Sequence, residues 1–273
     1  MIPRNSSLWA TLESLANSAQ IVVFAGIPGA GKSLLVQQLA RLSVNQGRQI
    51  QILQWDVARL AFETPSVLAR YPEIDGFTDP MLRRAVGYWA RSAICAWSQE
   101  NQHSRQLLVV EAPLIGGRLI ELADPSPNPG SDLSEPVLKA KSTRFVVPIP
   151  SLEVRHAIEQ ARARSIANPR HERERSDARV NVLQSVWLDV VDLARDLCWP
   201  SPHHPTYDPK LYSFVYSHLL RSRNPVMLNI DTVFQTRSSV YDIDMEIKEL
   251  SATTEEIEES LRVLESIVPG EHP

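Results

Sequence analysis

The chain is poor in cysteine, with only Cys95 and Cys198 among its 273 residues. Two such thiols form no disulfide framework and no metal-ligand spacing, so they are expected to be small buried side chains in a reducing compartment. Long apolar runs are also missing, because none approaches the roughly 18 residues of a membrane-spanning helix. The first residues, MIPRNSSLW, lack the order of a signal peptide. These absences predict a cytoplasmic protein with no membrane partner.

An excess of positive charge is lacking as well. The chain has 32 acidic and 28 basic residues and a net charge of −4, which gives no support for nucleic-acid binding by the whole molecule. The apolar fraction of 43% and the charged fraction of 22% are ordinary for a globular protein. The length allows one large domain or two small ones.

The most specific pattern lies in residues 21–33, IVVFAGIPGAGKS. An apolar run precedes the spacing G-x-x-x-x-G-K-[ST], which is typical of a loop that binds a nucleoside triphosphate. Glycines let backbone N–H groups turn toward an anion, the lysine reaches the β- and γ-phosphates, and the serine can ligate Mg²⁺. The predicted nucleotide-binding residues are Gly26, Ile27, Pro28, Gly29, Ala30, Gly31, Lys32, Ser33 and Leu34.

Apolar runs and helical periodicity alternate along the chain. The pattern predicts a three-layer α/β fold with a parallel five-stranded sheet, whose ligands lie at the carboxyl ends of the strands. Residues 1–240 are assigned to this domain and the acidic residues 241–273 to a helical extension. Strands are expected within 21–25, 49–56, 107–113, 144–150 and 225–231, and helices within 7–19, 34–44, 81–99, 152–166, 180–197, 209–221 and 253–267.

Two acidic residues close predicted strands. Asp56 ends the second strand, where a carboxylate can face the γ-phosphate as a general base, although an aspartate here can instead cap the next helix. Glu111 ends the third strand and is expected to hold Mg²⁺ together with Ser33. The alternative for Glu111 is a salt bridge to Arg118.

Seven arginines fall between residues 155 and 179, whereas the whole chain has five lysines. The stretch NPRHERERSD indicates a lid, residues 165–180, that closes over the triphosphate. Arg162 and Arg164 are the predicted nucleotide contacts, and Arg173 and Arg175 the predicted catalytic arginines. The alternative is a solvated surface with internal Glu–Arg pairs.

The chain resembles the P-loop kinases of the nucleoside and nucleotide kinase group in the order of its motifs, which are GIPGAGKS, ILQWD, LLVVEAP and the arginine-rich lid. The uridine kinase, pantothenate kinase and zeta-toxin-like types are the most similar. The resemblance covers about residues 20–232. It implies strand order 2-3-1-4-5, ATP and Mg²⁺ as cofactors, Asp56 as the base, and an acceptor-binding region over residues 62–100. The acceptor contacts it suggests are Tyr71, Arg83 and Arg84, with Arg118 added from the loop after the third strand.

The likeness is incomplete, because the lid reads R-E-R-S-D instead of R-x-x-R-D. The expected function is transfer of the γ-phosphate of ATP to a hydroxyl or phosphate of a small molecule such as a nucleoside or nucleotide. A nucleotide-binding regulatory ATPase without an acceptor is the alternative. A kinase acting on a nucleic-acid end is disfavoured by the acidic net charge.

Overall fold

The computed structural model describes residues 2–74, 77–125, 132–176, 178–200, 206–223, 225–236, 238–242 and 247–267. Asp177 of the predicted lid therefore lies outside the described residues. Within these ranges no helix is both long and apolar enough to cross a membrane.

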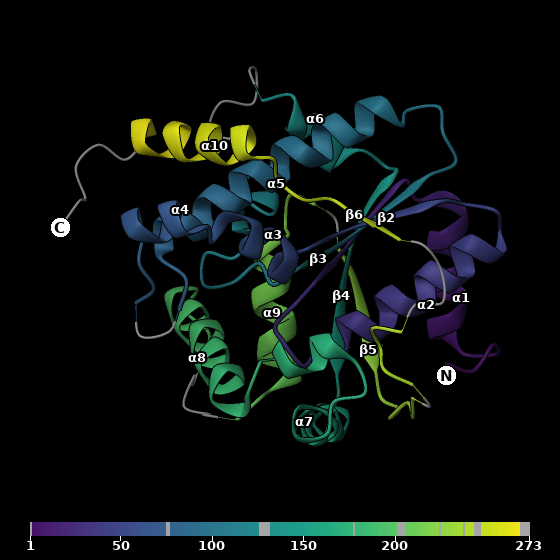
Figure 1. The fold of residues 1–273 in the computed structure, drawn as a ribbon. Coiled ribbons are helices and arrows are strands. Elements are labelled where there is room, and N and C mark those ends of the chain that lie inside the picture. The colour runs from purple at the N-terminus through teal and green to yellow at the C-terminus, as the bar shows by residue number, and fades with distance from the viewer. Residues whose placement is uncertain are drawn as a thin grey trace.

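A parallel sheet of six strands forms the middle layer (Figure 1). Its order is β5-β4-β1-β3-β2-β6, and every described pairing is parallel. The strands are β1 (Ile21–Ala25), β2 (Ile50–Gln54), β3 (Leu107–Ala112), β4 (Thr143–Pro150), β5 (Val226–Ile230) and β6 (Lys248–Glu249).

The predicted α/β class with a parallel sheet is confirmed, but the predicted count of five strands was wrong, so the full order differs. The five predicted strands keep the relative order 2-3-1-4-5, and a sixth is added at the edge. A sixth strand, β6, lies beyond β2, where Lys248 pairs with Gln51 and Glu249 with Ile52. Two residues are too few to show a period in the sequence. The pairing forms only because the end of the chain returns to this edge of the sheet.

Helices cover both faces of the sheet, which explains why every residue of β1 is buried. One face carries α3 (Trp55–Phe62), α4 (Pro65–Arg70), α5 (Pro80–Glu100), α6 (Ser134–Lys139), α8 (Val180–Asp196), α9 (Pro209–Leu219) and α10 (Thr254–Ile267). The other face carries α1 (Ser7–Ser18), α2 (Lys32–Asn45) and α7 (Leu152–Ala167). Two short 3₁₀ helices, η1 (Ile120–Leu122) and η2 (Glu172–Ser176), lie in connections.

The start of α2, like that of α8, has no side-chain cap, unlike the starts of α1, α5, α7 and α9. Side-chain oxygens of Ser6, Asp79, Ser151 and Asp208 accept backbone N–H groups at the starts of α1, α5, α7 and α9. The residue before α2 is Gly31, with φ +89° and no side chain to do this. The first N–H groups of α2 are therefore left for another acceptor, as in helices that bind anions.

The last described helix, α10, is part of the main core. Ile257, Leu261 and Leu264 on α10 are each at most 5% exposed and belong to the same apolar cluster as α5. Figure 1 shows α10, in yellow, lying along α5. The part of residues 241–273 that the structure describes thus packs with the sheet and its helices.

Candidate functional site

The glycine loop lies between the carboxyl end of β1 and the start of α2. Gly29 has a φ of +79°, and a Cβ there would lie 2.8 Å from Nη1 of Arg155. Gly26 has a φ of +151°, and a Cβ there would overlap the Tyr212 hydroxyl. Both positions need glycine for backbone conformation and for space.

Lys32 is buried at the base of this loop, at 6% exposure. Its Nζ donates a hydrogen bond of 3.1 Å to the carbonyl of Ile27 and lies 3.7 Å from Oε1 of Glu111. Burial is the main cause that lowers the pKa of Lys32, while the Glu111 carboxylate opposes it. An anion bound in the loop would stabilise the charged lysine.

Glu111 is brought to the loop by the register of the central strands. It lies opposite Phe24 of β1 and Gln54 of β2. The Ser33 hydroxyl donates to Oε1 of Glu111 at 3.3 Å, and Nε2 of Gln54 donates to Oε2 at 3.2 Å. The ion pair of Glu111 is with Lys32, whereas Arg118, the alternative partner, pairs with Asp189.

Ser33 and Glu111 fit the ligand set of Mg²⁺. A hydroxyl and a carboxylate already share a hydrogen bond beside the loop, and Mg²⁺ in nucleotide sites takes one or two such ligands together with phosphate oxygens and water. The described ranges contain no group of three or more His, Cys, Asp or Glu side chains that could hold a metal unaided. A metal here would depend on the nucleotide.

Asp56 does not end a strand, so that part of the prediction was wrong. β2 stops at Gln54, and Asp56 lies in the first turn of α3. Its side chain reaches solvent, but surrounding protein still limits its hydration; this desolvation, followed by the Glu111 charge, raises the pKa of Asp56. The charges of Arg59, Lys32 and Arg162, in that order, oppose this shift.

One face of α7 lines the loop. Arg155 is 2% exposed, donates to the carbonyl of Pro28 at 2.5 Å and to Glu159 at 2.6 Å, and stacks 5.4 Å from the centre of the Tyr207 ring. Arg162, seven residues later, lies on the same face and acts on the pKa of Lys32. Arg164 is about 200° further round the helix and is exposed. Arg155 is not among the residues predicted from the sequence, although its spacing from Arg162 could have indicated it.

The predicted lid includes η2, whose Arg173 reaches across to the sheet. Its guanidinium donates to Oε1 of Gln54 at 3.0 Å and also pairs with Glu249 of β6. Gln54 in turn donates to Glu111, which links the lid to the loop. Arg175, on the same 3₁₀ helix, is exposed.

The four suggested acceptor contacts fall into two groups. Arg83 and Arg118 lie together, because both donate to carbonyls of the loop after β3, at Gly116 and Ile115. Tyr71 instead donates to Glu265 of α10, and Arg84 lies 3.7 Å from Glu121. Only Arg83 and Arg118 are thus associated with the carboxyl end of the sheet.

Three tyrosines that are not among the predicted site residues support this end of the sheet. The Tyr216 hydroxyl donates to the carbonyl of Pro113 after β3, and the Tyr207 hydroxyl to that of Pro150 at 3.0 Å. The Tyr212 ring packs against the rings of both Tyr207 and Tyr216, and its hydroxyl lies close to Gly26. Tyr207 precedes α9, and Tyr212 and Tyr216 lie four residues apart within it, a helical spacing that was the available signal.

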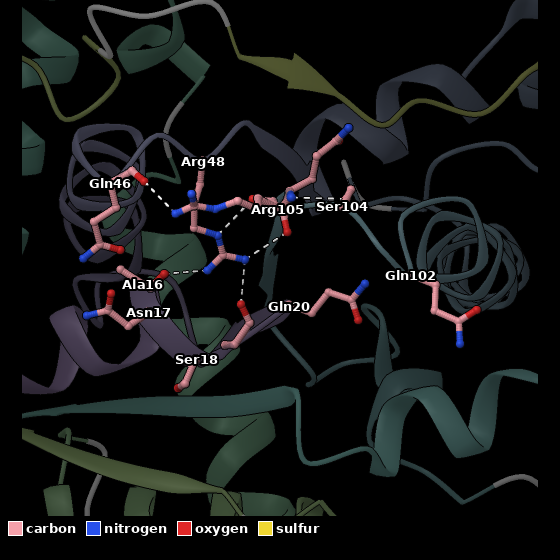
Figure 2. A pocket seen from close by; sticks show the side chains of 11 residues that line it. Ala16, Asn17, Ser18, Gln20, Gln46, Arg48, Gln102, Ser104 and Arg105 are labelled. Atoms are coloured by element: carbon pink, nitrogen blue, oxygen red, sulfur yellow. Dashed lines mark hydrogen bonds between the residues drawn. The ribbon is translucent and has the colours of Figure 1, made fainter.

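A pocket of about 330 Å³ lies at the opposite end of the sheet, by the amino ends of β1 and β3 (Figure 2). Arg48 projects into it and donates to the carbonyls of Ala16, Ala19 and Gln106. These bonds satisfy carbonyls at the end of α1 and before β3. Arg48 thus has a structural role in this pocket, where it pairs carbonyls at the ends of neighbouring elements. The pocket lies apart from the glycine loop.

Comparison with known proteins gives no relative for this chain: no protein-family model matches it, and neither does any curated protein or solved structure.

Proposed function

We propose that this protein is an ATP- and Mg²⁺-dependent phosphotransferase that moves the γ-phosphate to a hydroxyl or phosphate of a small molecule. One observation carries the proposal. Lys32 and Ser33 of α2 contact Glu111 of β3 beside a helix start without a side-chain cap, and the charge of Asp56 on α3 acts on Lys32. Phosphoryl transfer needs little more from a protein than positioning and charge stabilisation.

The loop and Lys32 would bind the triphosphate. The open N–H groups at the start of α2 suit phosphate oxygens, and Lys32 would exchange its bond to the Ile27 carbonyl for one to the β- and γ-phosphates. Ser33 and Glu111 would hold Mg²⁺, which neutralises phosphate charge when bound. Arg155 supports this role because it fixes the Pro28 carbonyl inside the loop.

Asp56 would accept the proton of an attacking hydroxyl. Its raised pKa makes it a stronger base than an ordinary aspartate, and its partial exposure leaves room for an acceptor. Arg162, close to both Lys32 and Asp56, is better placed than Arg173 to offset charge on the transferring group. Arg173 would first have to leave Gln54 and Glu249.

The test is a search for a phosphorylated product. The protein is incubated with Mg²⁺–ATP and a pool of nucleosides, nucleotides, vitamins and sugars, and species that gain a phosphate are sought by mass spectrometry. Lys32→Ala should abolish both nucleotide binding and product, whereas Lys210→Ala, at an exposed site on α9, should change neither.

Two other outcomes count against the proposal. Tight binding of ATP without a product in any pool would favour the nucleotide-responsive regulator. Failure to bind ATP, measured by calorimetry with folded protein, would remove the nucleotide function altogether.

A further inference from the structure

The loop between β3 and η1 has an unusual backbone. Leu114, Gly116, Gly117 and Leu119 all have φ between +57° and +74°. Glycine adopts this region freely, but each leucine costs about 1–2 kcal/mol there. The loop is closed on itself, since the N–H of Leu114 donates to the carbonyl of Arg118 at 2.9 Å. Such strain persists only where surrounding contacts impose it.

Two arginines impose this conformation. Arg83, from the first turn of α5, donates to the carbonyl of Gly116, and Arg118 donates to that of Ile115 at 3.4 Å. A Cβ on Gly116 would lie 2.7 Å from Oδ2 of Asp189, so the loop is pressed against α8. The two guanidinium groups are consequently held near each other at the end of β3.

The charge of this pair is only partly balanced. Burial, and next the charge of Arg83, lowers the pKa of Arg118. The carboxylate nearest to Arg118 is that of Asp189, and its closest oxygen is 3.8 Å from Nη1, beyond hydrogen-bond distance. Among the described residues, the buried Nε of Arg83 has no hydrogen-bond partner. Donors of both side chains thus remain for a further acceptor.

The pair lies toward the proposed base. Arg83 and Arg118 hold the loop that directly follows β3, the strand that carries Glu111. The charge of Asp56 acts on the pKa of Arg118, and the charges of Glu111 and Lys32 act on that of Asp56. A molecule with its reacting oxygen at Asp56 would therefore have its far end near Arg118 and Arg83. Guanidinium forks match phosphate and carboxylate groups in charge and shape.

We propose that Arg83 and Arg118 bind a phosphate or carboxylate of the acceptor, so that the substrate is an anionic small molecule. This rests on the proposed phosphotransferase function. The acceptor oxygen forms a bond to the γ-phosphorus, the bond from that phosphorus to the β–γ bridging oxygen breaks with its electrons left on ADP, and the acceptor proton passes to Asp56. The arginines take no part in bond making and set which acceptor is held.

The first experiment does not depend on turnover. Protein saturated with Mg²⁺ and a non-hydrolysable ATP analogue is titrated with inorganic phosphate and, separately, with acetate, by calorimetry. We expect at least one anion to bind the loaded protein, and Arg118→Met to weaken that binding by at least tenfold. Arg118→Lys keeps the positive charge but not the planar guanidinium, so its anion affinity should lie between those of the wild type and Arg118→Met. Arg195→Met, at an exposed ion pair on α8, is the matched control.

Circular dichroism melting of each variant separates loss of the anion site from loss of the fold. Anion binding that is unchanged in folded Arg118→Met and Arg83→Met, or absent in the loaded wild type, would overturn the inference while nucleotide binding still stands. If the analogue itself does not bind, the proposed function and this inference both fail.

The second experiment identifies the anion. The metabolite pool is divided into phosphate-bearing, carboxylate-bearing and neutral fractions. Lys32-dependent product should appear in one of the first two, with an acceptor KM raised at least tenfold by Arg118→Met and an unchanged ATP KM. A product found only in the neutral fraction would contradict the proposal of an anionic acceptor, while the proposed phosphotransferase function would still stand.

Discussion

At the scale of single residues, the site depends on charges that are held out of water. Lys32 and Arg155 are buried cations, and Asp56 and Glu111 are the carboxylates near them. Each buried charge has a direct partner on the loop or on a neighbouring strand, such as the Pro28 carbonyl for Arg155. Their arrangement suits a polyanion, whose charge would offset the repulsion among the cations.

Asp56→Asn should lower the rate of phosphoryl transfer by about 10²- to 10⁴-fold, the usual contribution of a general base. Nucleotide affinity should be retained, since the loop is untouched. In the wild type the active form is the carboxylate, so kcat should fall as the pH drops through the raised pKa of Asp56, above the ordinary 3.8. Steady-state kinetics across pH test this, with Asp192→Asn on the exposed side of α8 as control. An unchanged kcat would remove Asp56 from the mechanism.

Arg155→Met should weaken ATP binding by at least tenfold and destabilise the fold by about 2 kcal/mol. The variant leaves the Pro28 carbonyl without its donor and removes the cation that stacks on Tyr207. Arg164→Met, on the exposed side of the same helix, should do neither. Calorimetry and urea denaturation measure the two effects. Equal behaviour of the two variants would show that Arg155 does not position the loop.

At the scale of elements, the glycine loop is shaped jointly by β1, α2, α7 and α9. Gly29 faces Arg155 of α7, Gly26 faces Tyr212 of α9, and Ile158 of α7 lies 3.6 Å from where a Cβ on Gly31 would be. The conformation of the loop is thus imposed by helices from distant parts of the chain. A change in the loop should disturb these contacts as well as the loop itself.

Gly29→Ala and Gly47→Ala provide a matched pair. Both glycines are left-handed, with φ of +79° and +73°, so each alanine should cost about 1–2 kcal/mol in backbone energy. A Cβ at Gly47 meets nothing within 4 Å, whereas at Gly29 it meets the Arg155 guanidinium. Both variants should lose similar stability from this cause, but only Gly29→Ala should lose most of its ATP affinity. Equal ATP affinity in the two would count against the loop as the nucleotide site.

At the scale of the whole molecule, the first and last described elements pack in the same three-layer structure. α1 packs on the face opposite α10, and β6 extends the edge beside β2. Glu249 of β6 also holds Arg173 of η2, which joins the end of the chain to the lid. The described part of the C-terminal segment is therefore expected to unfold together with the rest.

Leu261→Ala should destabilise the protein by about 2–5 kcal/mol, the usual cost of emptying a buried leucine site. Leu261 is 1% exposed, whereas Val263 on the same helix is 38% exposed, so Val263→Ala should cost no more than about 0.5 kcal/mol. Urea denaturation should show one transition in both variants. A separate transition for α10, or equal costs, would indicate an independent extension.

The sequence by itself determined the local features. Uninterrupted apolar runs predicted β1, β3 and β4, because strands covered on both faces have no polar side, and the glycine spacing predicted the loop before α2. Glu111 lies beside Lys32 and Ser33 because parallel strands end at one edge of the sheet. These inferences need only short-range pattern and the geometry of a parallel sheet.

Tertiary structure decided what depends on contacts between distant residues. β6 has too few residues to show a period, and β2 ends before Asp56 because α3 begins at Trp55. The choice of Arg155 over Arg164, and of Arg83 over Arg84, depends on which side of a helix meets the loop, and all four look alike in sequence. A side chain acquires such a role from neighbours that folding brings to it, because charge and hydrogen bonding act over a few ångströms.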